Sequence, residues 1–97
     1  MSKEQVFAEI KAHIAHCGGS YSSWYAGIAS DARDRLFSGH CVKEHGDSWI
    51  YRTCDSDEDA RTVENALLSL GMKGGPCGGD QTTKSVYAYK IGSHTTE

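Results

Sequence analysis

The fold is decided by residues 24–40, which read WYAGIASDARDRLFSGH. The first five are rich in aromatic and β-branched side chains, so they are predicted to form a strand. Gly27 lies inside this strand, which indicates that another backbone or a ligand approaches closely there. Ser30 or Asp31 can then cap a short helix that runs through Phe37. The stretch is therefore a strand, a turn and a helix.

The segments on either side of this stretch are predicted from the spacing of their apolar residues. They are a helix over 3–16, a strand over 48–53, a helix over 56–70, a glycine-rich loop over 74–79 and a strand over 84–91. Strands that alternate with helices indicate an α/β (α+β) fold class, with a small three-stranded sheet flanked by about three helices.

The length and composition of the chain limit the number of domains and the classes of protein to which it can belong. Its 97 residues suffice for one modest core, so residues 1–92 are expected to form a single domain and residues 93–97 a disordered tail. The chain has no long apolar run and no secretion signal at its polar N-terminus, so we expect no membrane span and a cytoplasmic location.

The formal net charge of −3 argues against generic electrostatic binding to nucleic acid. A local basic patch stays open, and its candidates are Arg33, Arg35, Lys43 and Arg52.

Four cysteines leave the thiol chemistry open: Cys17, Cys41, Cys54 and Cys77. An even count is compatible with two disulfides, but a reducing compartment favours free thiols. No C-x-x-C pair occurs. A zinc site that includes His16 or His40 is an alternative, against the simpler interpretation of small core residues.

Glu64 is a candidate functional carboxylate on the predicted helix over 56–70. It follows Val63, and Ala60 and Leu68 lie one turn to either side, so Glu64 is at the margin of the apolar face. Such a carboxylate is half-buried or directed into a pocket. The alternative is a boundary residue that pairs with an arginine such as Arg61 or Arg35.

Three side chains in the opening stretch could carry chemistry. Arg35 is suited to holding a phosphate, since its planar fork matches two oxygens and stays charged. His40 could orient a water or transfer a proton. Tyr25, close to Gly27, could direct its hydroxyl into a cleft. The alternatives are surface positions for Arg35 and His40 and core packing for Tyr25.

These residues resemble the core of the GIY-YIG nuclease family. Tyr25 and Gly27 match the YIG element at the end of a strand, and Arg35 falls at the arginine position of the helix that follows. His40 is the candidate for the histidine at the helix end, one place later than the family has it. After a further strand, Glu64 matches the family's metal-binding glutamate. The resemblance covers residues 24 to about 70.

One part of the family pattern is missing at the expected place. A GIY strand normally precedes the YIG strand, whereas a helix is predicted here. Residues 85–87, Ser-Val-Tyr, are similar to GIY, so we expect the C-terminal strand to lie beside Tyr25, with Tyr87 in the role of the missing tyrosine. The chain would then be a circular permutation of the family's core.

The resemblance implies metal-dependent hydrolysis of phosphodiesters in nucleic acid, DNA in the first place. It implies that Glu64 binds one Mg²⁺ or Mn²⁺ ion, that Arg35 stabilises the transition state, that Tyr25 or Tyr87 helps to deprotonate the attacking water, and that His40 orients that water.

Two further positions and one rival function complete the expectations. Gly27 and Arg33 are assigned to substrate binding. The chain is expected to be a monomer or a homodimer paired through a sheet edge. The rival function is a catalytically inactive binding or regulatory module, which the acidic balance and the missing first strand favour.

Overall fold

The structure, a computed structural model, describes residues 2–74 and 83–95. Helix α1 (Lys3–Cys17) begins at Ser2, whose hydroxyl oxygen accepts a hydrogen bond from the Gln5 N–H. The predicted stripe is buried, since Val6, Ile10 and Ile14 face the core. A single turn, η1 (Tyr21–Ser23), leads into the first strand.

The described residues contain one antiparallel sheet with strand order β1-β3-β2. Its strands are β1 (Trp24–Ala29), β2 (Trp49–Thr53) and β3 (Ser85–Lys90). The last strand in the sequence is therefore the central one, with Gly27 opposite Tyr87 and Tyr25 opposite Tyr89. The prediction that the C-terminal strand lies beside Tyr25 is confirmed.

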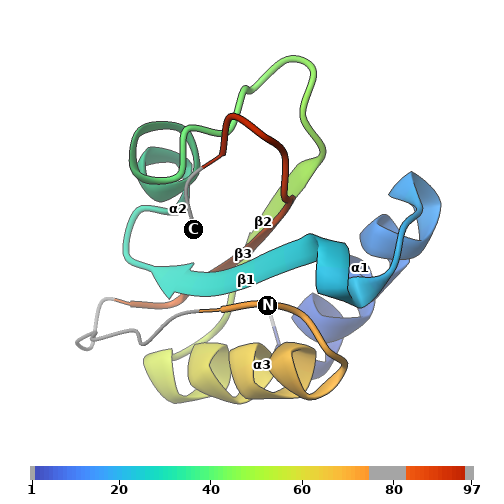
Figure 1. The fold of residues 1–97 in the computed structure, drawn as a ribbon. Helices are drawn as coiled ribbons and strands as arrows, with labels where there is room; N and C mark the ends of the chain where they lie inside the picture. Colours follow the sequence, from blue (N-terminus) through green and yellow to red (C-terminus); the bar gives the residue numbers. More distant parts are fainter. Residues whose placement is uncertain (1, 75–82, 96–97) are drawn as a thin grey trace.

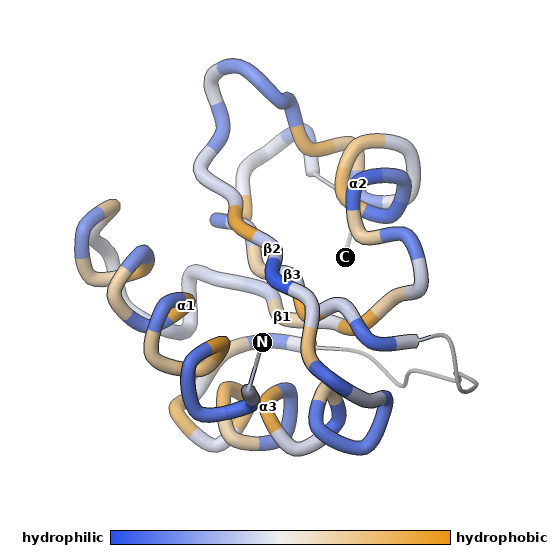
Figure 2. Tube along the Cα trace, turned by 180° about the vertical axis from the view of Figure 1, so that it is seen from behind, coloured by the Kyte–Doolittle hydropathy of each residue, from blue (hydrophilic) through white to orange (hydrophobic). Residues whose placement is uncertain are grey.

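Two layers of helix bury the two faces of this sheet (Figure 1). Helices α1 and α3 (Asp57–Ser69) cover one face, where Val63 and Leu67 of α3 pack with Val86 and other even-numbered positions of β3. Figure 2 shows hydrophobic and hydrophilic colours alternating along α3, as expected for a helix with one buried side.

The other face is covered by a short helical segment, α2 (Ala32–Asp34) followed by η2 (Arg35–Gly39). Asp31 caps it by accepting a hydrogen bond from the Asp34 N–H. The segment ends in a π turn rather than an α turn, because the His40 N–H donates to the carbonyl oxygen of Arg35 at 2.8 Å. Leu36, within η2, is fully buried against the sheet.

The α+β fold class with its three-stranded sheet is confirmed, and the element boundaries shift by one or two residues. Most of the glycine-rich loop predicted over 74–79 lies outside the described residues. Of the predicted tail, residues 93–95 form a turn in which Thr95 N–H donates to the Gly92 carbonyl, and residues 96–97 lie outside the description. Within the described chain, no helix has the length and apolar character needed to cross a bilayer.

Candidate functional site

The end of the π turn places His40 between two tyrosine hydroxyls of the central strand. The Nε2 atom lies 2.7 Å from the hydroxyl oxygen of Tyr87, and Nδ1 lies 3.2 Å from that of Tyr89. His40 is 8% exposed, whereas Tyr87 and Tyr89 are buried. Both ring nitrogens are thus engaged by phenols, which fixes the orientation of the imidazole.

Gly27 makes this contact possible. A Cβ atom at position 27 would lie 2.5 Å from the hydroxyl oxygen of Tyr87 and 2.6 Å from its Cζ atom. The phenol of Tyr87 therefore crosses β1 over Gly27 on its way to His40. The close approach predicted at Gly27 exists, but a neighbouring side chain makes it, not a backbone or a ligand.

Tyr25 completes what we call the tyrosine–histidine cluster, formed by Tyr25, His40, Tyr87 and Tyr89. The ring centroid of Tyr25 lies 4.9 Å from that of His40 and 5.3 Å from that of Tyr89, on which it stacks. Tyr25 is 8% exposed, so core packing accounts for most of its surface. The sequence interpretation missed Tyr89, although it lies two positions after Tyr87 and a strand places residues at that spacing on one face.

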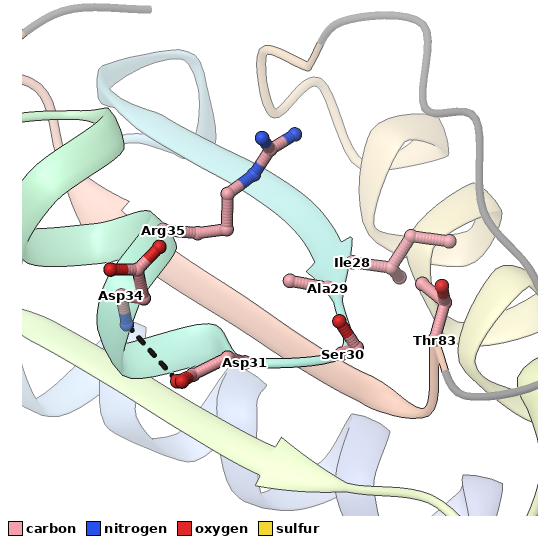
Figure 3. Close-up of a pocket in the computed structure, with 7 residues that line it drawn as sticks. All are labelled: Ile28, Ala29, Ser30, Asp31, Asp34, Arg35 and Thr83. Atoms are coloured by element: carbon pink, nitrogen blue, oxygen red, sulfur yellow. Dashed lines mark hydrogen bonds between the residues drawn. The ribbon is translucent and has the colours of Figure 1, made fainter.

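Arg35, at the start of the π turn, is joined to this cluster through its carbonyl oxygen, which accepts from the His40 N–H, and its side chain is exposed. It borders a pocket of about 330 Å³ between the end of β1 and the start of α2, together with Ser30, Asp31 and Thr83. Figure 3 shows the guanidinium extending from the start of η2 toward β1, away from Asp31. Within residues 2–74 and 83–95, this guanidinium has no hydrogen-bond or salt-bridge partner, which leaves its donors available to an anion.

Arg33, the other arginine of this segment, is directed elsewhere. Its guanidinium pairs with Glu44 at 3.0 Å and lies 5.2 Å from the ring centroid of Phe37. Hydrogen bonding to Tyr51 and then to Glu44 raises the pKa of Arg33. Arg33 and Arg35 therefore border different pockets.

Glu64 is not part of the tyrosine–histidine cluster. It is 8% exposed and belongs to α3, the helix that covers the opposite face of the sheet. It lies among the buried residues of that helix, beyond the margin position that its spacing predicts. The structure thus brings together Tyr25, His40 and Tyr87, puts Arg35 beside them, and keeps Glu64 on the other layer.

A zinc site receives no support from the described part of the chain, where no three His, Cys, Asp or Glu side chains form a group suited to a metal ion. Cys54 is buried among the α1 and α3 side chains, and burial raises the pKa of its thiol. Cys17 lies on α1 with its Sγ atom 3.5 Å from Nε2 of His13. Cys77 is outside the described residues.

Tyr87→Phe tests the hydrogen bond at the centre of the cluster. The ring and its packing over Gly27 remain, and only the hydroxyl is lost, so we expect the free energy of unfolding to fall by about 1–3 kcal/mol. Urea denaturation measures the change. The matched control is Tyr21→Phe, at a half-buried position with no side-chain hydrogen bond among the described residues, where we expect less than about 0.5 kcal/mol. Equal losses in the two variants would contradict a specific role for the Tyr87 hydroxyl.

Comparison of the chain with protein-family models, with curated proteins and with solved structures found no match.

Proposed function

We propose that this protein hydrolyses phosphodiester bonds in nucleic acid, DNA in the first place, as a GIY-YIG-like endonuclease that uses Mg²⁺ or Mn²⁺. The observation that supports this proposal is the neighbouring placement of Tyr25, Tyr87 and His40 on one face of the sheet, with Arg35 exposed beside them. Phenols, an imidazole and a guanidinium are the groups that a phosphodiester hydrolase needs for proton transfer and charge stabilisation.

Arg35 is assigned to the phosphate. Its guanidinium can donate two parallel hydrogen bonds to phosphate oxygens and keeps its charge at every working pH. In the transition state the phosphoryl oxygens carry extra negative charge, and a fixed cation lowers its energy more than that of the bound substrate.

The tyrosine–histidine cluster is assigned to positioning and proton transfer. One imidazole tautomer satisfies both phenols: Nδ1–H donates to Tyr89, and Nε2 accepts from Tyr87. His40 then orients Tyr87 instead of a water, which differs from the role that the family resemblance implies. Tyr25, at 8% exposed against 1% for Tyr87, is the phenol assigned to the attacking water.

Glu64 is the carboxylate assigned to the metal ion. Magnesium prefers oxygen ligands and usually takes one or two carboxylates, so the glutamate has the ligand chemistry that this ion requires. When bound, the ion would supply charge neutralisation at the phosphate. Helix α3 packs against β1, the strand whose end borders the Arg35 pocket.

Cleavage assays test this proposal. We expect the purified protein to cut plasmid DNA or RNA in the presence of magnesium or manganese and to stop when a chelator is added. Glu64→Gln should abolish cutting. Glu58→Gln, the same change at an exposed position in the first turn of the same helix, should leave it intact.

The rival function is a binding module without cleavage, and the burial of Tyr87 and His40 favours it. A normally folded protein that cuts neither substrate with either metal would overturn the nuclease proposal in favour of that module.

A further inference from the structure

A row of aromatic rings connects the helical segment α2–η2 to strand β2. The Phe37 ring meets the Trp49 ring edge-on at 5.0 Å, and the Trp49 and Tyr51 rings lie 6.1 Å apart with planes only 9° from parallel. All three side chains are half-buried. We call Phe37, Trp49 and Tyr51 the aromatic ledge.

The ledge opens at its Tyr51 end. The next position on the same face of β2 is Thr53, which is exposed and too small to cover the Tyr51 ring. The space there is an open pocket of about 570 Å³, lined by Trp49, Tyr51, Thr53 and two arginines, Arg33 and Arg52. Guanidinium groups are thus the only charged side chains among its described lining residues.

We propose that the aromatic ledge binds unpaired bases of a single-stranded segment of nucleic acid. A base would stack on the open face of the Tyr51 ring, in line with the nearly parallel rings of Trp49 and Tyr51. Arg33 and Arg52 would contact the adjoining phosphates. Bases inside a duplex already stack on their neighbours, so only an unpaired base can present its face to the ledge. This inference rests on the proposed function and adds to it the form of the substrate.

The two arginines are held in place for such contacts. Arg33 pairs with Glu44 and Arg52 pairs with Glu9 at 2.8 Å, and both guanidinium side chains stay about half exposed. A guanidinium has five N–H donors, so one carboxylate partner leaves donors for a phosphate.

A second copy of the chain is the other conceivable occupant, and the edge of β2 argues against it. The bonds from Lys90 N–H to Ser48 and from Cys54 N–H to Lys84 show that the Tyr51 backbone groups point away from β3. Nη1 of Arg52 donates to the Tyr51 carbonyl at 2.7 Å. A charged side chain thus occupies the acceptor that an incoming strand would need.

Tryptophan fluorescence provides the test. Trp24 is fully buried and Trp49 is half-buried, so quenching by an added oligonucleotide reports on Trp49. We expect an oligothymidylate of about eight nucleotides to quench the wild-type protein saturably, in chelator and without metal, and a blunt duplex to quench it far less. Tyr51→Leu should weaken binding about tenfold, whereas Tyr51→Phe, which keeps the ring and loses only the hydroxyl that bonds to Arg33, should weaken it far less.

Three results would overturn the inference: no quenching by the single strand, equal quenching by the duplex, or unchanged affinity in a folded Tyr51→Leu variant. A dimer that Tyr51→Leu dissociates, without quenching in the wild type, would overturn it in favour of a second copy. Because chelator prevents metal-dependent cleavage, the two proposals fail separately: quenching without nuclease activity refutes only the nuclease, and nuclease activity without quenching refutes only the ledge.

Discussion

Gly27→Ala is expected to lower the free energy of unfolding by about 1–3 kcal/mol, a large fraction of the stability of a small domain. The added methyl would lie 2.5 Å from the Tyr87 hydroxyl oxygen and 2.6 Å from Cζ, distances that two non-bonded atoms do not sustain. Because both strands are held in register by the sheet, relief requires the Tyr87 ring to move. Movement of the ring also breaks its hydrogen bond to His40.

The chain offers a matched control in Gly39→Ala. A methyl at position 39 would meet only the Arg35 Cδ atom, at an ordinary 3.6 Å. Gly39 lies within the π turn, where alanine is at least as favourable as glycine, so we expect no loss of stability. The urea midpoints of the two variants measure this difference in stability. An equal loss at both positions would show that the passage of the Tyr87 ring over residue 27 is not the reason that glycine is required there.

Arg35→Ala is expected to reduce the cleavage rate by about 100- to 1,000-fold, the range found when one group that stabilises transition-state charge is removed. Stability should change by less than about 0.5 kcal/mol, because the side chain is exposed and has no polar partner in the described part of the protein. Arg35→Lys should recover only part of the rate, since an ammonium keeps the charge and loses the two-pronged geometry.

Initial rates of DNA cleavage, measured with thermal unfolding of the same samples, test this expectation. Lys43→Ala removes a positive charge from the loop that follows η2 and should leave the rate unchanged to within about twofold at physiological salt. A similar loss in both variants would indicate that overall charge, not the position of Arg35, controls activity.

The sequence predicts the elements because they depend on short-range rules: strand alternation, caps and glycine stops. The expectation that the C-terminal strand lies beside Tyr25 comes from the family resemblance, and the pairing of β1 with β3 agrees with it. The sequence does not predict the bonds of His40, whose partners are residues 87 and 89. Which phenol reaches which nitrogen depends on where the end of η2 lies over β3, and no local spacing contains that information.

Glu64 illustrates a different limit. Helical spacing puts it at the margin of the apolar stripe of α3, whereas the structure buries it, and spacing does not tell which face of the sheet that helix covers. The covering face depends on how the chain crosses from β2 through α3 to β3, which is a property of the whole topology.

The central position of β3 has a consequence for how the protein is made. Strands β1 and β2 leave the ribosome well before β3, and they do not pair with each other. Before β3 is synthesised, β1 can bond to the backbone of Lys73 along its outer edge, but neither β1 nor β2 has the strand that pairs with it in the sheet. Pairing between distant segments also slows folding relative to local hairpins. Chaperone dependence during translation would thus be a property of the strand order itself, separate from any property of the mature protein.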